Sequence, residues 1–385
     1  MALSVTPTSR MLPTDESVAL LDLVREIADA ELAPKVAQYE HDGTFFRDEL
    51  RTLGAAGLLS LPYPESVGGG GQPYEVYLQA LEELAGTWLS VAISVSVHSL
   101  ACFPVAEYGT DEQKAQWLPG MLGGDQLGAY CLSEPSSGSD AAALVTRAVR
   151  DGSDYVVDGT KAWITHGGVA DFYNLMVRTS DDGPRGISCL LAPAGTPGLS
   201  SAPPERKMGA KASRTAQVLL DGARVPASQL IGAEGQGFKI ALAALDAGRL
   251  GIAACAVGLA QAALDAASAY SKERRQFGRA IGEFQGIAFM LADMATQVSA
   301  ARALVLEAAR RKDRGLPFSV EAAKAKLFAT DVAMKVTTDA VQVFGGYGYV
   351  EDFPVERYMR EAKVLQIVEG TNQVQRMVIG RSLTS

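Results

Sequence analysis

The stretch Gln366–Arg376 (QIVEGTNQVQR) decides how the rest of this 385-residue chain is interpreted. It sets one carboxylate, Glu369, between apolar residues and a glycine, just ahead of a last predicted helix. A carboxylate held away from bulk water has a raised pKa and can act as a base near neutral pH. Gly370 lets a ligand approach the backbone, and Thr371 is a good N-cap for the helix that follows. Most Glu-Gly pairs are solvated turns, so the remaining sequence must separate a turn from a catalytic base.

The composition is that of a soluble globular protein, with 48% hydrophobic and 21% charged residues. A chain of 385 residues exceeds one compact core, so two or three domains are expected. The net charge of −9 argues against a nucleic-acid-binding protein and against a polybasic membrane-surface protein. A few local arginines can still bind phosphate on an acidic protein.

The cysteines and histidines are scattered and form no C-x-x-C pair, so we expect neither disulfides nor a metal site. The first residues lack a basic start followed by an apolar run, which predicts no secretory signal and a cytoplasmic location. The longest apolar stretch, residues 250–264, contains Gln261 and is flanked by Arg249 and Asp265. We therefore expect a buried helix there and no membrane span.

Residues 1–122 are predicted to form an N-terminal α-helical domain. Thr14 supplies a cap, Asp15 and Glu16 an acidic first turn, and apolar residues then recur at helical spacing. Further helices are predicted at residues 48–56, 74–84, 91–108 and 111–122. The four glycines at 68–71 follow no strand, so we interpret them as a loop and not as a phosphate cradle.

Residues 123–230 are predicted to form a middle antiparallel β domain, either a barrel or a sandwich. Short alternating runs predict strands at residues 144–150, 154–158, 161–165, 172–179, 187–192 and 217–220. Asp151-Gly152 and Asp158-Gly159 stand where hairpin turns are expected.

Residues 231–385 are predicted to form a C-terminal four-helix bundle. Long helices are expected at residues 236–271, 283–314 and 320–344, with a continuous apolar stripe on the last of them. The glycines at 232–237 superficially resemble a dinucleotide loop, but no strand-helix-strand unit surrounds them, so a simple connection is expected.

Five segments, in this order, resemble those of the acyl-CoA dehydrogenase family over nearly the whole chain. They are residues 129–140 (AYCLSEPSSGSD), 159–165 (GTKAWIT), 274–278 (RRQFG), 342–348 (QVFGGYG) and the Glu369 segment. The resemblance implies an α+β multidomain fold with helical, β and helical-bundle parts, and it implies FAD as the cofactor.

The resemblance also assigns site residues. It implies that Ser133 bonds the flavin edge, that Trp163 packs on the flavin, that Thr165 bonds near its N5 atom, and that Arg275 reaches the FAD pyrophosphate of a neighbouring subunit. A planar guanidinium can donate two hydrogen bonds to phosphate. The full set of implied cofactor contacts is Tyr130, Leu132, Ser133, Ser139, Trp163, Ile164, Thr165, Arg275, Phe277, Gln285, Gln342, Val343, Gly345, Gly346, Thr371 and Gln373. The implied substrate contacts are Ser139, for the pantetheine arm, together with Asp246, Arg249 and Gly370.

The resemblance gives Glu369 the role of the catalytic base. Removing a proton α to a thioester needs a base in a dry pocket, and the β hydrogen leaves as hydride to FAD. Some relatives carry the base on the helix at the position of Gly248, with a small residue in the loop; here the glycine is on the helix and the carboxylate in the loop. Val368 stands where straight-chain members often have an aromatic residue, and Gly248 resembles short-chain members.

The resemblance implies an enzyme of fatty-acid β-oxidation that oxidises acyl-CoA to trans-2-enoyl-CoA, passes electrons to an electron-transfer flavoprotein, and assembles as a homotetramer, a dimer of dimers. Three alternatives stay open at this point. The same fold serves oxidases, and an acyl-carrier-protein thioester presents the same pantetheine arm as CoA. A flavin-free scaffold protein is the non-enzyme alternative. Monooxygenases of this fold do not abstract an α proton and would have no use for Glu369.

Overall fold

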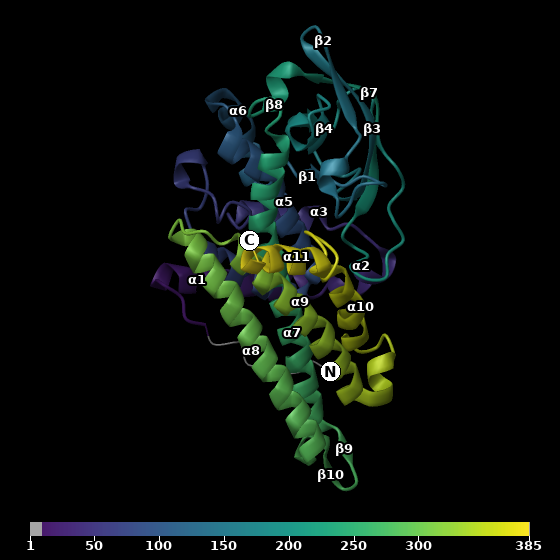
Figure 1. Ribbon diagram of the computed structural model, residues 1–385. Coiled ribbons are helices and arrows are strands. Elements are labelled where there is room, and N and C mark those ends of the chain that lie inside the picture. Colours follow the sequence, from purple (N-terminus) through teal and green to yellow (C-terminus); the bar gives the residue numbers. More distant parts are fainter. Residues whose placement is uncertain (1–9, 385) are drawn as a thin grey trace.

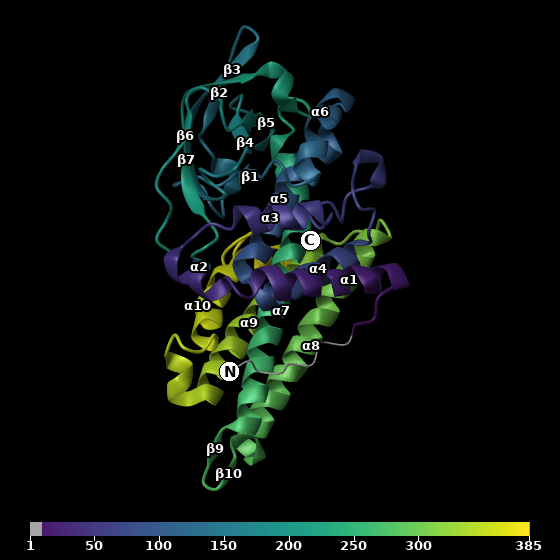
Figure 2. The same ribbon diagram turned by 180° about the vertical axis from the view of Figure 1, so that it is seen from behind.

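The computed structural model describes residues 10–384; residues 1–9, with which the expected N-terminal domain begins, and residue 385 lie outside it. In Figures 1 and 2 the β domain lies at one end with the last N-terminal helix beside it, the other N-terminal helices cross the middle, and the long C-terminal helices extend to the other end. The expected α+β fold class and its order of helical, β and helical parts are confirmed.

The N-terminal helices follow the apolar spacing of the sequence. Thr14 caps the first of them, because its side chain accepts a hydrogen bond from the Ser17 N–H at 3.1 Å. The last carries a capping box made by Thr110 and Gln113. The helices are α1 (Asp15–Ile27), α2 (Val36–Asp42), α3 (Arg47–Ala55), α4 (Tyr74–Thr87), α5 (Leu89–Tyr108) and α6 (Asp111–Leu122). Of these, α2 was not predicted.

The middle domain is a sheet in the order β6-β7-β3-β2-β4-β5-β8, with β1 pairing with β4. Most neighbours are antiparallel as expected, but β1 runs parallel to β4, so the sheet is mixed. Parallel neighbours need a long connection, and here the chain passes through β2 and β3 between them. The strands are β1 (Gly128–Cys131), β2 (Arg147–Asp151), β3 (Asp154–Thr165), β4 (Phe172–Arg178), β5 (Ile187–Pro193), β6 (Leu199–Ser201), β7 (Thr215–Pro226) and β8 (Leu230–Ile231).

One predicted turn is present and one is not. Asp151-Gly152 begins the tight connection between β2 and β3, as predicted. The predicted turn at Asp158-Gly159 is wrong, because β3 continues through it with a bulge in its pairing to β7. Gly159 has a φ of 150°, and a Cβ there would lie 2.5 Å from Thr146 Oγ1. The glycine therefore permits a close approach of two strands, and no reversal of the chain.

The C-terminal helices form the predicted bundle, in which α7, α8, α9 and α10 pack on one another. The first three begin and end within two residues of the predicted bounds. The elements are α7 (Gly237–Glu273), the small hairpin β9 (Arg275–Gln276) and β10 (Arg279–Ala280), α8 (Gln285–Asp313), α9 (Ser319–Phe344), α10 (Val355–Leu365) and α11 (Asn372–Thr384).

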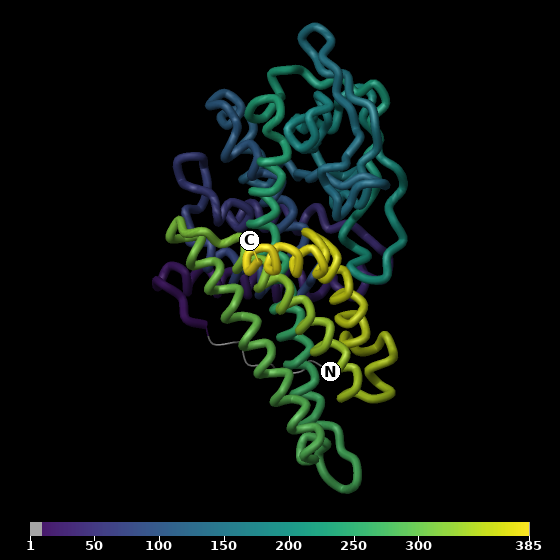
Figure 3. The backbone as a smooth tube through the Cα atoms, in the orientation of Figure 1, coloured from purple at the N-terminus to yellow at the C-terminus, as the bar shows by residue number. Residues whose placement is uncertain are grey.

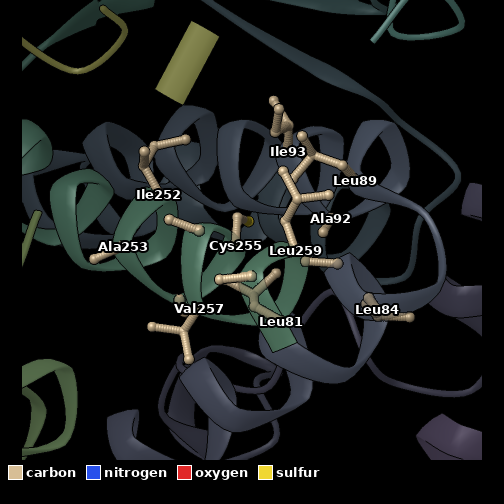
Figure 4. Packing of buried hydrophobic residues seen from close by; sticks show 14 of the residues in the cluster. Leu81, Leu84, Leu89, Ala92, Ile93, Ile252, Ala253, Cys255, Val257 and Leu259 are labelled. Carbon is tan, nitrogen blue, oxygen red and sulfur yellow. The ribbon is translucent and has the colours of Figure 1, made fainter. Parts of the chain in front are cut away.

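The N-terminal and C-terminal helices share one core. Helices α4 and α5 pack against α7, and Figure 4 shows Leu81, Leu89, Ile93, Ile252 and Leu259 interdigitating at that contact. Because this core spans both helical regions, it fixes α5 and α7 relative to each other, and these two helices wall the site described below.

Three of the described helices, α5, α7 and α8, are long and apolar enough to cross a bilayer by length and composition alone. The apolar windows of α5 and α7 are 94% and 72% buried inside the protein. Their hydrophobicity is thus accounted for by the shared core, and the expected buried helix at residues 250–264 lies within α7. The corresponding window of α8 is only 22% buried.

Candidate active site

Glu369 lies in a strained turn between α10 and α11. Its φ is +54°, and that of Gly370 is +85°; a non-glycine residue in the left-handed region is uncommon and persists only where its surroundings hold it. Gln375 donates hydrogen bonds from Nε2 to the carbonyls of Glu369 (3.2 Å) and Gly370 (2.8 Å). Thr371 caps α11 as predicted, because its Oγ1 accepts from the Val374 N–H at 3.3 Å. The turn is therefore fixed from within the helix that follows it.

Glu369 is half-buried as a residue, but the Oε2 atom of its carboxylate is buried. Its Oε2 has no hydrogen-bond partner within residues 10–384. A Cβ placed on Gly248 of α7 would lie 3.0 Å from this oxygen. Burial raises the pKa of Glu369 to about 7, although the nearby Arg249 and Lys326 act to lower it. The geometry gives a carboxylate that can exchange a proton near neutral pH.

Arg249 lies near the Glu369 carboxylate. Its side chain is 7% exposed, and its Nη1 is 2.5 Å from Asp246 Oδ1, one turn earlier on α7. Ser319 Oγ donates to the same Asp246 oxygen at 2.9 Å, while Arg249 Nε has no partner among the described residues. The predicted substrate residue Arg249 therefore lies near Glu369, with Asp246 as its partner and its Nε–H without an acceptor in the described part of the chain.

Lys326 of α9 was not predicted as a site residue. Its side chain is fully buried, and its Nζ donates to the Gly370 carbonyl and to Asn372 Oδ1, each at 2.9 Å. A signal was present in the sequence, because Lys326 interrupts the apolar stripe that Ala322, Ala329 and Ala333 continue. A lysine on such a stripe is buried with a partner or breaks the core.

The loop that follows β1 approaches the base from the β domain. Tyr130 is buried, and its hydroxyl has no partner within the described chain. Burial raises the pKa of that phenol, and Cys189 and then Glu369 raise it further. Leu132 is buried beside Leu100 and Ala244 in one apolar cluster. Ser133 is half-buried, and Ser139 is exposed. Tyr130 therefore lies near enough to Glu369 for the two groups to interact electrostatically.

A buried ion pair holds this loop. Lys161 of β3 donates to Glu134 Oε1 at 2.8 Å, and the two side chains are 0% and 1% exposed. Glu134 also accepts from the backbone N–H groups of Val145 (2.7 Å) and Thr146 (3.0 Å). The loop that carries Ser133 and Ser139 is thereby tied at both ends to the sheet.

Trp163 stands at a bulge near the end of β3. Its φ is +62°, the pairing register with β7 shifts between Lys161 and Ile164, and the indole is 66% exposed while Ile164 is 2% exposed. Thr165 is half-buried. The bulge turns a large flat aromatic outward, where a planar ligand can stack on it.

The other predicted cofactor residues lie far from Glu369 along the bundle. Arg275 and Phe277 are on the β9–β10 hairpin, at the opposite end of the bundle from the β domain (Figure 3), and Phe277 is 93% exposed. A cavity of about 830 Å³ beside the hairpin is lined by Val343, Gly345 and Gly346. Gln285 and Gln342 are exposed, as is Gln373 near the base on α11. Within one chain the predicted cofactor residues therefore form two separate groups.

A small cavity of about 50 Å³ lies below Gly248, between α4, α5 and α7. Its wall includes Tyr63, Tyr77, Leu100 and Phe103. Leu100 also approaches Gly248 on the side of the base, because a Cβ at 248 would lie 3.3 Å from Leu100 Cδ1. Gly248 therefore borders both the cavity and the Glu369 carboxylate.

The acyl-CoA dehydrogenase family models match nearly all of the chain: the N-terminal domain at residues 14–125, the middle domain at 129–223 and the C-terminal domain at 235–384. An acyl-CoA dehydrogenase of Bacillus subtilis is 45% identical over 372 residues, covering 96% of this chain and 98% of the relative. The solved butyryl-CoA dehydrogenase of Megasphaera elsdenii is 42% identical with a TM-score of 0.95, covering 98% of this chain and all of that one. A chain from work on the electron transferring flavoprotein of Acidaminococcus fermentans is 45% identical with a TM-score of 0.95, covering 97% and 99%.

Proposed function

The chain belongs to the acyl-CoA dehydrogenase family, and from that premise we propose that it oxidises a short acyl-CoA thioester to the trans-2-enoyl-CoA, with Glu369 as the base. The observation that carries the proposal is the buried Oε2 of Glu369, which faces Gly248 and lacks a partner within residues 10–384. Such a group is poised to take a proton from a substrate that displaces the remaining water.

The two groups of predicted cofactor residues fit FAD. The exposed Trp163 supplies a stacking surface, and Tyr130 supplies a hydroxyl that has no partner among the described residues. Gly345 and Gly346 stand beside open space, so that a ligand can lie directly against the backbone. When bound, FAD supplies the two-electron acceptor for the β hydrogen. The residues proposed to hold it near the base are Tyr130, Leu132, Ser133, Ser139, Trp163, Ile164, Thr165, Thr371 and Gln373.

The protein's own part in the reaction is to bind, orient and deprotonate the thioester. Glu369 Oε2 takes the α proton, and the carboxyl becomes neutral in a site that burial already favours for the neutral form. As the proton leaves, the thioester oxygen gains charge and needs hydrogen-bond donors. The Glu369 backbone N–H, which makes no hydrogen bond within residues 10–384, is proposed as one of them. Ser139, Asp246, Arg249 and Gly370 are proposed to contact the CoA arm.

The small cavity supports a short acyl group. About 50 Å³ beyond Gly248 has room for on the order of three or four water-sized groups. Tyr63, Tyr77 and Phe103 close it with bulky rings. A long straight chain would have to displace these packed side chains, at a cost of about 1–3 kcal/mol or more.

Assembly as a homotetramer, a dimer of dimers, is proposed from the split between the two groups of cofactor residues. Arg275, Phe277, Gln285, Gln342, Val343, Gly345 and Gly346 would complete the cofactor site of a second copy, because they lie too far along the bundle to reach their own. The exposed face of α8, with Phe289 at 61% exposure, supplies further apolar surface for such contacts. We propose that α8 is covered by another copy and does not span a membrane, and that the protein works in the cytoplasm. We also propose that an electron-transfer flavoprotein is its electron acceptor.

The deciding experiment is anaerobic bleaching of the flavin absorbance by a panel of acyl-CoA thioesters. We expect butyryl-CoA to bleach the purified yellow protein, with a matching trans-2-enoyl product. A protein that stays colourless after FAD is added, or that is bleached by no acyl-CoA, would overturn the proposal. Rapid reoxidation of the bleached protein by air would favour the oxidase alternative.

A further inference from the structure

The turn that carries the base is anchored by a buried ammonium group. Lys326 Nζ donates at 2.9 Å to the carbonyl of Gly370, the residue directly after Glu369. Its second bond goes to Asn372 Oδ1, also at 2.9 Å, at the start of α11. Lys326 therefore holds the turn from α9, across 44 positions of sequence, while Gln375 holds it from the other side.

The anchor is charged, although a neutral donor could make the same bonds. Asn372 donates on through Nδ2 to Thr330 Oγ1 (2.9 Å) and Asp331 Oδ1 (2.7 Å). No carboxylate within the described residues lies in ion-pair distance of Lys326 Nζ. A fully buried ammonium without a direct counter-ion is costly, so its retention beside a carboxylate that must ionise calls for an explanation.

The charged and titratable groups that face Glu369 can be enumerated by element. Helix α7 presents Arg249 with its partner Asp246, α9 presents Lys326 with Asp331 behind it, α4 presents Tyr74, and β1 presents Tyr130. Both tyrosines have pKa values raised well above the ordinary range by burial, so they are neutral. Arg249 is already compensated by Asp246 at 2.5 Å, whereas Lys326 has no such ion-pair partner in the part of the chain that the structure describes.

We propose that Lys326 is a positioning residue for the base, fixing the Glu369–Gly370 turn and supplying the positive charge that lets the buried carboxylate ionise. The inference rests on the proposed function, because it assigns a partner to the same base. Burial lowers the pKa of Lys326 to about 8, with Glu369 acting to raise it, so the ammonium form persists near neutral pH. Removing this charge should move the pH at which Glu369 ionises upward, since an adjacent opposite charge favours the ionised form by about one to three pH units.

The test is the pH dependence of flavin reduction in the FAD-loaded enzyme, measured by stopped flow at saturating butyryl-CoA. Lys326→Met and Lys326→Gln remove the charge, and Lys326→Arg retains it. Lys335→Met is the matched control, because Lys335 lies on the same helix but pairs with Asp339 at the surface, with 54% of its side chain exposed.

For wild type and Lys335→Met we expect the rate to rise with pH through one common midpoint. For both neutral variants the midpoint should rise by at least one pH unit, with the rate at pH 7 reduced at least fivefold and largely recovered at pH 9. Lys326→Arg should keep the wild-type midpoint even where its rate is lower.

Neutral variants that keep the wild-type midpoint would overturn the inference, whether their rates are normal or uniformly reduced. Flavin absorbance and thermal unfolding of each variant identify misfolding, and two neutral side chains of different polarity keep the comparison available if one variant does not fold. Failure of the proposed function looks different, because then wild type itself is bleached by no acyl-CoA.

Discussion

Glu369 and Gly248 meet across the site so closely that a single added carbon on the glycine would lie 3.0 Å from the carboxylate Oε2. This is tighter than an ordinary contact, and Gln375 holds the backbone of the turn that carries the carboxylate. A glycine inside a helix such as α7 weakens the helix by about 1 kcal/mol relative to alanine. At position 248 it leaves room for the Glu369 carboxylate.

Gly248→Ala should slow flavin reduction at least tenfold while the helix becomes no less stable. The added methyl must displace the carboxylate from its position, and small displacements of a reacting group can cost about 100-fold in rate. Stopped-flow reduction and thermal unfolding measure the two effects. Gly380→Ala in α11 is the control, because a Cβ there meets no atom within 4 Å and should leave reduction unchanged. A Gly248→Ala enzyme as fast as wild type would show that the contact does not constrain the base.

Glu369→Gln should give a folded, yellow protein that binds acyl-CoA but hardly reduces its flavin. Losing a positioned base costs on the order of 10²–10⁴ in rate. Asp246 of α7 is not free to replace it, because Arg249 and Ser319 both bond to its carboxylate. Wild-type reduction should rise with pH through about 7, the pKa that burial gives Glu369, and this limb should be lost in the variant. Near-normal reduction by Glu369→Gln would remove Glu369 from the role.

The same substitution should change stability in a pH-dependent direction. Folding raises the pKa of Glu369 from 4.5 to about 7, so the folded state prefers the neutral acid. Its stabilising effect is complete below pH 4.5 and is lost as pH rises through 7, by at most about 3 kcal/mol. Glu369→Gln cannot ionise, so its melting temperature should gain on that of wild type between pH 5 and pH 8. A constant difference across this range would mean that Glu369 ionises as easily folded as unfolded.

Sequence reasoning singled out Glu369 but could not reveal what holds its turn. The cap at Thr371 and the glycine at 370 are local, so they could be predicted from neighbouring residues alone. Lys326 anchors the turn from 44 positions away in the sequence. The sequence alone does not show whether a lysine side chain is buried, so this contact could not be predicted. Gly159 was misassigned for a related reason, since a glycine that permits a turn and one that permits close approach to Thr146 look alike until both strands are placed.

Arg275→Ala should weaken FAD retention without unfolding the chain. Arg275 and the 93%-exposed Phe277 project from a hairpin far from their own Glu369, and a guanidinium there is suited to a phosphate of a second copy's cofactor. Flavin content after dialysis and the mass from light scattering measure the effect. Arg185→Ala is the control, because Arg185 is 84% exposed and pairs only locally with Asp182. A monodisperse wild-type monomer with tightly bound FAD would contradict the shared site.

Acyl length should be limited by the rings below Gly248, so that butyryl- and isobutyryl-CoA reduce the flavin faster than octanoyl- and palmitoyl-CoA. Each methylene buried in a fitted pocket contributes only about 0.8 kcal/mol, or roughly a fourfold preference, so attraction alone cannot give a sharp limit. The sharper term is exclusion, because the cavity offers about 50 Å³ before Tyr63, Tyr77 and Phe103 close it. Phe103→Ala should therefore move the optimum toward octanoyl-CoA, whereas Phe328→Ala, on the partly exposed face of α9, should leave it in place. An optimum at palmitoyl-CoA in wild type would place the acyl chain along another route and leave the role of Glu369 untouched.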